Sequence, residues 1–140
     1  MKGIEIRRLG VQDAALVLSV RDGVFDGPIL APQLHRKLAA PDQLLMAAIA
    51  PEGIVAMASG VIVLEPDKPP SFYLDEIGVH EGWRRRGIGL ALGRRVLEEA
   101  RAMGCASVWL AMEQHNTAAR ALYARLGGQA QTGVVVYSWP

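Results

Sequence analysis

The stretch FYLDEIGVHEGWRRRGIGLALGRRVLEEARAM, residues 72–103, places an apolar strand before a glycine-containing turn and an amphipathic helix. Apolar residues of its second half recur at helical spacing: Ile88, Leu92, Val96, Ala100 and Met103. Charged residues occupy the other side of that helix, and Gly104 is expected to end it. The pattern predicts a strand over residues 72–80, followed by a helix that begins at the glycines.

The turn Arg84-Arg85-Arg86-Gly87-Ile88-Gly89 has the chemistry of an anion-binding site. The first turn of a helix leaves backbone N–H groups without partners and carries the positive end of the helix dipole. Gly87 and Gly89 lack the Cβ atoms that would keep a phosphate group away from those N–H groups. We therefore expect main-chain amides at this helix start to bind a phosphate or pyrophosphate.

Composition excludes several other classes of protein. The chain has 140 residues, of which 51% are hydrophobic and 21% charged, which suits one compact domain spanning residues 1–140. A net charge of +1 predicts no binding to nucleic acid, and no apolar stretch reaches the roughly 20 residues of a membrane helix. Scattered histidines and the single Cys105 predict no metal site and no disulfide. The N-terminus lacks a secretory signal, so we expect a cytoplasmic protein.

Turn residues divide the rest of the chain into further elements. Strands are expected over residues 3–9, 44–50, 54–64, 107–113 and 134–139, and helices over residues 11–22, 31–40 and 117–126. The order β-α-α-β-β-β-α-β-α-β predicts an α/β fold in which a mixed, mostly antiparallel sheet has helices on both faces.

Residues 116–127, NTAARALYARLG, contain a second informative pattern. Asn116 suits the N-cap of a helix, and Gly127 suits its C-terminal end. At helical spacing, Asn116, Ala119 and Tyr123 share one face, which therefore presents a polar cap, a small residue and a phenol. The same spacing also fits an ordinary apolar core stripe.

Three segments together resemble the GNAT superfamily of acetyl-CoA-dependent N-acetyltransferases. Arg84-x-x-Gly87-x-Gly89 fits its pyrophosphate loop, Ile77-x-Val79 fits the preceding strand, and Asn116-x-x-Ala119-x-x-x-Tyr123 fits a later helix. The order of elements fits as well. Residues 67–70, 75–79 and 116–123 also look like the small GNAT aminoglycoside 3-N-acetyltransferases.

The resemblance implies that acetyl-CoA is the cosubstrate, without a metal, and that main-chain groups bind most of it. The N–H groups from Arg86 to Ala91 would hold the pyrophosphate, and the edge of Ile77–Val79 would pair with the pantetheine arm. The thioester would lie beside Tyr123 and near Asn116. The coenzyme-binding positions so implied are Ile77, Gly78, Val79, Arg84, Arg85, Arg86, Gly87, Ile88, Gly89, Leu90, Ala91, Asn116, Ala119 and Tyr123. Gly78 is consistent with a ligand that approaches the strand closely.

Acetyl transfer to an amine needs a base and an acid. An aliphatic amine with a pKa near about 10 is mostly protonated at neutral pH and must lose a proton before it attacks a thioester. Glu76 is our candidate base, because strand alternation points it away from Ile77 and Val79. Asp75 is the alternative if a bulge intervenes. Tyr123 is the candidate acid that donates to the leaving thiolate.

Acidic residues indicate a cationic acceptor. Asp22, Asp26, Glu65 and Asp67 fall in loops that, by the resemblance, border the acceptor cleft, and we expect Asp26, Glu76 and Glu113 to contact substrate. A polyamine, an aminoglycoside, a protein lysine or a protein N-terminus would all fit. Residues 134–137 form an apolar segment near the terminus, from which we expect a homodimer.

Two other interpretations use the same residues. Gly87-x-Gly89-x-x-x-Gly93 resembles a dinucleotide fingerprint with Glu113 about 20 residues later, but too little chain follows for a second nucleotide-binding half. A coenzyme A-binding module without catalysis would keep the same fold. Turnover with an amine distinguishes this module from an enzyme.

Overall fold

A five-stranded sheet forms the centre of the computed structural model, which describes all 140 residues. In spatial order its strands are β1 (Glu5–Arg8), β2 (Gln43–Ala50), β3 (Gly53–Glu65), β4 (Lys68–Val79) and β5 (Ser107–Trp109). The first four strands pair antiparallel, whereas β5 runs parallel to β4. The predicted mixed, mostly antiparallel sheet is confirmed.

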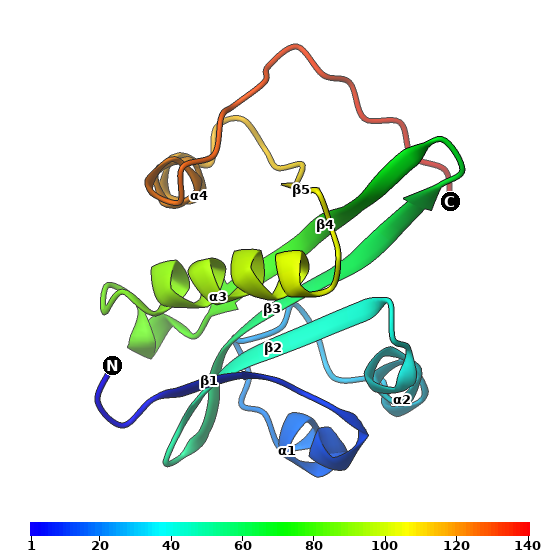
Figure 1. Cartoon of the computed structure of the whole chain (residues 1–140). Helices are drawn as coiled ribbons and strands as arrows, with labels where there is room; N and C mark the ends of the chain where they lie inside the picture. Colours follow the sequence, from blue (N-terminus) through cyan, green and yellow to red (C-terminus); the bar gives the residue numbers. More distant parts are fainter.

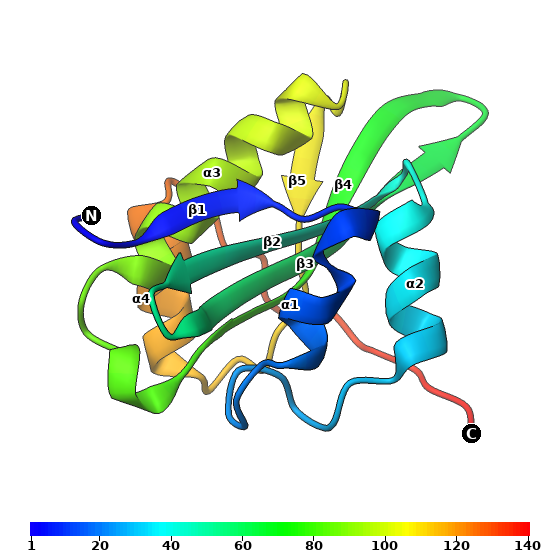
Figure 2. The ribbon, with the colours of Figure 1, turned by 90° about the horizontal axis from the view of Figure 1, so that it is seen from below.

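Helices cover both faces of this sheet, as predicted (Figure 1). They are α1 (Ala14–Leu18), α2 (Ala31–Ala39), α3 (Ile88–Ala102) and α4 (Thr117–Arg125), with short 3₁₀ helices η1 (Val11–Asp13) and η2 (Glu81–Trp83). Figure 1 shows α1 and α2 below the sheet and α3 above it, and Figure 2 shows α1 and α2 side by side across β2 and β3. None of the helices combines the length and apolar character needed to cross a membrane.

The central strands are buried on both faces, which explains their nearly uninterrupted apolar sequences. Along β2, Leu44 and Met46 belong to the core between the sheet and α3, while Leu45 and Ala47 belong to the core between the sheet and helices α1 and α2. Alternating side chains of one strand thus contribute to two separate cores.

Three elements have an end that differs from the predicted one by more than two residues. Helix α1 stops at Leu18, because the Ser19 hydroxyl donates to the Leu16 carbonyl at 3.0 Å and competes with a further helical turn. Strand β4 begins at Lys68 and includes two prolines, which are tolerated because β5 pairs with β4 only from Ser71 onward. Strand β5 ends at Trp109, where its pairing with β4 ends.

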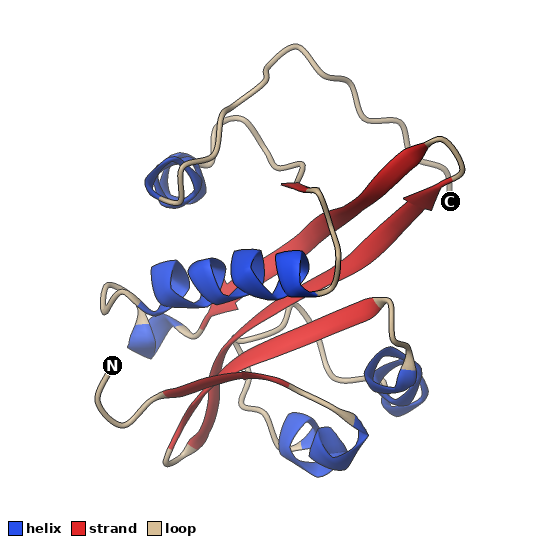
Figure 3. Cartoon of the chain, viewed as in Figure 1, coloured by secondary structure: helices blue, strands red, loops and turns tan.

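The predicted last strand, residues 134–139, is wrong. These residues are extended chain without strand structure (Figure 3), and residues 129–140 make no backbone hydrogen bond. The apolar side chains of residues 134–137 and of Trp139 are 64–82% exposed. A sequence with high strand propensity forms a strand only beside a partner strand, and this segment has none.

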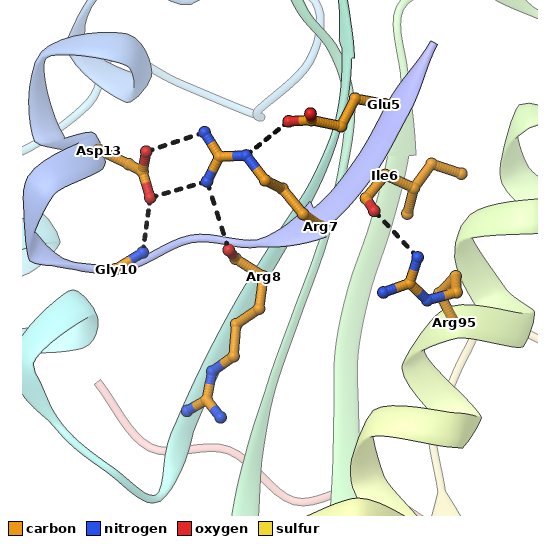
Figure 4. Close-up of polar contacts among 7 residues, drawn as sticks. All are labelled: Glu5, Ile6, Arg7, Arg8, Gly10, Asp13 and Arg95. Carbon is orange, nitrogen blue, oxygen red and sulfur yellow. Dashed lines mark hydrogen bonds and ion pairs between the residues drawn. The ribbon is translucent and has the colours of Figure 1, made fainter. Parts of the chain in front are cut away.

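A partly buried ion pair fastens β1 to the first helical turn (Figure 4). The Arg7 guanidinium donates two bonds of 3.0 Å to the Asp13 carboxylate, which also accepts the Gly10 N–H at 2.8 Å. These bonds, chiefly the one from Arg7, lower the pKa of Asp13 even though burial raises it. On the other face, Arg95 of α3 donates to the Ile6 carbonyl at 3.0 Å, so both layers hold β1.

Candidate active site

A β-bulge in β4 orients the candidate bases. Leu74 pairs with Gly60 and Glu76 pairs with Ser59, so Asp75 is an extra residue with no partner in β3. The bulge shifts the side-chain alternation: Leu74 before it and Ile77 after it both pack in the core beneath α3. Glu76 therefore lies on the opposite face, toward α1 and α2, and the condition set for Asp75 as the alternative base is met.

The space beside Gly78 that a side chain would fill is taken by the protein itself. A Cβ on Gly78 would lie 2.5 Å from the Val24 carbonyl oxygen, so the space above this glycine belongs to the protein's own loop between α1 and α2. The loop thus accounts for the missing side chain at Gly78, and coenzyme binding along the main-chain edge of this residue stays a prediction. Sequence reasoning missed Val24, whose main-chain contact carries no sequence signal.

The loop that contacts Gly78 also brings a second carboxyl group to Glu76. Glu76 is partly buried, and Asp26 lies within hydrogen-bonding reach of it. Burial raises the pKa of Glu76, and the charge and hydrogen bond of Asp26 and the charge of Asp75 raise it further. The fold thus brings together three carboxyl groups that are distributed over two separate segments of the sequence.

Other predicted acceptor residues lie apart from this cluster. Glu113 is exposed in the turn before α4, where its carbonyl accepts the Asn116 N–H at 3.1 Å, and it does not contribute to the pKa of Glu76. Asp67 is exposed at the β3–β4 turn and forms a 3.0 Å ion pair with Lys68. Asp26 is therefore the loop carboxylate that joins the cluster.

Strands β4 and β5 stop pairing close to this carboxyl cluster. Their parallel pairing covers only Ser71–Tyr73 and Ser107–Trp109, and β4 then continues to Val79 with no strand on that edge. The main chain of residues 77–79 thereby has no strand partner on one side, where the Val79 carbonyl accepts only a side-chain bond from Arg84. This free edge is the kind of surface on which an extended ligand adds main-chain hydrogen bonds.

The glycine turn presents a continuous run of free amides. Gly87 is the N-cap of α3 with a φ of 80°, and Arg85 has a φ of 63°, both in the left-handed region. The backbone N–H groups of residues 85–90 have no partner within the protein. The Ala91 N–H donates to the Gly87 carbonyl at 3.0 Å, so our inclusion of Ala91 among the free amides is wrong. The helical bonding pattern simply begins there.

Two of the three arginines stabilise the turn itself. The Arg84 Nε donates to the Val79 carbonyl at 3.1 Å, which ties the turn to the end of β4. Arg86 donates to the Gly82 carbonyl at 3.2 Å, and its guanidinium lies 4.5 Å from the centre of the Trp83 ring. Arg85 makes no hydrogen bond, so its charge remains free for an anion.

Helix α4 has the predicted ends. The Asn116 side chain accepts the Ala119 N–H at 3.1 Å, and Gly127 has a φ of 87° while the Gly128 N–H donates to the Tyr123 carbonyl at 3.0 Å. Tyr123 is half-buried against the core beneath α3. Burial raises the pKa of its phenol, so the hydroxyl keeps its proton at neutral pH.

Helix α4 and its C-terminal end pack against α3 at two glycines. A Cβ on Gly93 would lie 2.6 Å from Leu126 Cδ1, so a side chain here would require the Leu126 side chain to move. At Gly89 a Cβ would meet Leu122 and Val79 at 3.7 Å, an ordinary contact. The packing of α4 on α3 therefore uses the missing side chain at position 93 and leaves room for one at position 89.

The sequence profile described as "Acetyltransferase (GNAT) family" matches residues 18–128. The chain belongs to the GNAT family of acetyltransferases. It is therefore an acyltransferase, and acetyl-CoA is the cosubstrate of this family.

Solved acetyltransferases share the fold of this GNAT enzyme. An aminoglycoside acetyltransferase from an uncultured soil metagenomic sample is 19% identical with a TM-score of 0.82, over 99% of this chain and 96% of that one. An aminoglycoside N-acetyltransferase in complex with CoA is 20% identical with a TM-score of 0.78, over 97% and 94%. A ribosomal-protein-alanine N-acetyltransferase from Brucella melitensis biovar Abortus 2308 is 19% identical with a TM-score of 0.75, over 97% and 99%.

The main-chain geometry of this GNAT enzyme suits a diphosphate. A run of unpartnered N–H groups at a helix start binds phosphate oxygens through hydrogen bonds and the helix dipole. One hollow of the surface lies elsewhere, between the β3–β4 hairpin and β5, and is lined by residues such as Val63, Lys68 and Trp109. This hollow is lined by Glu65, one of the predicted acceptor-loop carboxylates, but by no residue of the Asp26–Asp75–Glu76 cluster or of the glycine turn.

Proposed function

We propose that this enzyme transfers the acetyl group of acetyl-CoA to a primary amine of a small cationic molecule by direct attack. The observation that carries the proposal is the position of Glu76: it lies beside the point where β4 loses its β5 neighbour, with Asp26 and Asp75 around it. A carboxyl cluster at the free edge of β4 attracts a protonated amine and supplies a base for it.

Glu76 acts as the general base in this proposal. A base is most effective when its pKa approaches the operating pH, and the partial burial and neighbouring carboxyl groups of Glu76 raise its pKa in that direction. Asp75 is more exposed and serves as the alternative base. A proton taken from the ammonium group by Glu76, directly or through water, leaves a neutral amine that attacks the thioester carbonyl.

Tyr123 acts as the general acid. Its phenol stays protonated because burial raises its pKa, and a coenzyme A thiol has an ordinary pKa near about 8.5, below that of the phenol. A hydrogen bond from the phenol therefore stabilises the departing thiolate. Tyr123 packs on the α3 face of the sheet, whereas Glu76 lies on the opposite face. Strand β5 stops pairing with β4 at Trp109, so no strand next to the rest of β4 separates these two faces.

Coenzyme A is held by main-chain groups. The free N–H groups of residues 86–90 would bind its pyrophosphate, with Arg85 adding charge, and the unpaired edge of Ile77–Val79 would bind the pantetheine arm. Asn116 uses its side chain to cap α4 and acts by positioning that helix.

The test is an assay of thiol release from acetyl-CoA against a panel of amines that includes polyamines, aminoglycosides, lysine peptides and protein N-termini. We expect turnover with a small polycation, a loss of about 10²-fold or more in kcat/KM for Glu76→Gln, and little change for Glu52→Gln, an exposed carboxylate in the β2–β3 turn. Tyr123→Phe should lower kcat far more than it weakens coenzyme A binding. Turnover confined to peptides would redirect the proposal to a protein acetyltransferase, and tight binding without any turnover would contradict it.

A further inference from the structure

Lys37, in the last turn of α2, reaches from its helix to the sheet. Its Nζ donates to the Gly60 carbonyl at 3.2 Å and to the Gln43 side-chain oxygen at 2.8 Å. The side chain is half-buried, yet no carboxylate lies within ion-pair distance of it. An ammonium group that is half-buried and bound only to neutral oxygens is uncommon, because burial favours pairing with an opposite charge.

The carbonyl that Lys37 binds belongs to the bulge. Gly60 pairs with Leu74, and the next residue of β4, Asp75, is the extra residue of that bulge. Gly60 cannot carry a side chain here, since its Cβ would lie 2.6 Å from the Tyr73 carbonyl oxygen and would overlap the Phe72 ring. Lys37 thus holds the part of β3 that is opposite the irregularity in β4, and this irregularity turns Glu76 toward α1 and α2.

Lys37 also provides positive charge beside the carboxyl cluster. Burial lowers the pKa of its ammonium group, while the charges of Asp75 on β4 and Asp42 before β2 raise it. The groups that act on Glu76 are Asp26 from the loop between α1 and α2 and Asp75 from its own strand. Asp75 is therefore the carboxyl group whose charge acts on both Lys37 and Glu76.

We propose that Lys37 is a positioning residue for acetyl transfer, which holds the β3–β4 bulge through Gly60 and offsets the negative charge of Asp75 beside Glu76. This inference rests on the proposed function, because it assumes that Glu76 removes a proton from a cationic acceptor. A neutral residue at position 37 would make the cluster more negative. Glu76 would then hold its proton to higher pH, and a protonated acceptor would be attracted more strongly.

The experiment measures kcat/KM as a function of pH, with the best cationic acceptor of the amine panel, for the wild type and for three variants. Lys37→Met removes the charge and keeps the aliphatic stem, Lys37→Arg keeps the charge, and Arg36→Met removes an exposed charge from the same helical turn. For Lys37→Met we expect the acid limb of the pH profile of kcat/KM, which reports Glu76, to move to higher pH by about half a unit or more. KM for the cationic acceptor should fall. Lys37→Arg should restore the wild-type limb, and Arg36→Met should leave it unchanged.

Failure of this inference differs from failure of the proposed function. If Glu76→Gln abolishes the acid limb but Lys37→Met leaves it in place, the role of Lys37 is overturned and Glu76 remains the base. If Glu76→Gln retains both the limb and full turnover, the proposed function fails first. Lys37→Gln repeats the test should the methionine variant not fold. If neither neutral variant folds while Lys37→Arg does, Lys37 supports the fold alone and the electrostatic role is overturned.

Discussion

The Val24 carbonyl oxygen lies against Gly78, only 2.5 Å from the position that a Cβ on this glycine would take. This contact seats the loop between α1 and α2 directly on β4, two residues from Glu76. Asp26, two residues beyond Val24, is thereby held beside the candidate base. A glycine in the strand and a main-chain oxygen in the loop thus determine the geometry of the acidic cluster.

Gly78→Ala should therefore destabilise the protein. A main-chain oxygen cannot rotate away as a side chain would, and overpacking of this kind costs about 1–3 kcal/mol. Urea denaturation measures the loss, and activity should fall with it because Asp26 moves. Gly27→Ala is the matched control, since no atom lies within 4 Å of a Cβ at Gly27. Equal stability of the two variants would contradict the packing described.

Substitutions of the two glycines before and within α3 should have different effects. Gly87 has a φ of 80°, so Gly87→Ala should cost about 1–2 kcal/mol of stability. Gly89→Ala meets only ordinary contacts at 3.7 Å and should leave the melting temperature close to that of the wild type. Calorimetry with coenzyme A should nevertheless show weaker binding for Gly89→Ala, because a methyl group crowds the free amides. Unchanged affinity would place the diphosphate elsewhere.

Glu76→Gln should make the protein more stable at neutral pH while it abolishes activity. The folded-state pKa of Glu76 is raised above its unfolded value of about 4.3, so its contribution is fully present below that pH and is lost as pH rises through the folded pKa. The melting temperature of the variant should exceed that of the wild type at pH 8, and the difference should shrink by pH 4. A variant that is less stable at both pH values would contradict this.

Asp13→Asn should weaken the link between β1 and η1. The side chain loses its charge-assisted bonds with Arg7, which should cost roughly 1–3 kcal/mol at neutral pH. Because the folded pKa of Asp13 is lowered, this stability is present above the unfolded pKa of about 3.9 and is lost as pH falls through the folded value. Urea midpoints of the wild type and the variant should therefore converge under acid conditions. Glu5→Gln, which alters an exposed partner of Arg7, should change stability little.

The exposed C-terminal segment should be covered by a second copy of the chain. Four consecutive apolar side chains, residues 134–137, are 64–77% exposed, and such a patch favours self-association. Light scattering should give the mass of a dimer at micromolar concentration, and Val135→Lys should shift it to the monomer. A monomeric wild type at the highest soluble concentration would contradict the expectation.

Local rules were sufficient to predict the two helices that flank the proposed coenzyme site. Gly87 caps α3, and Asn116 and Gly127 delimit α4, because caps depend on hydrogen bonds among residues that are neighbours in sequence. The order of the elements likewise predicted that helices cover both faces of the sheet. The same rules were wrong for residues 134–139, because a strand requires a partner that the periodicity of its own sequence cannot reveal.

Tertiary structure alone decided how the acidic cluster is assembled. Only the register of β3 against β4 shows that Asp75 is the bulged residue, beside the pair of Gly60 with Leu74. The meeting of Asp26 with Glu76, and of Lys37 with Gly60, joins segments far apart in the sequence. The sequence by itself therefore determined the helix start with its free amides, a property of successive backbone groups, whereas the charge and direction of the candidate base depend on long-range packing.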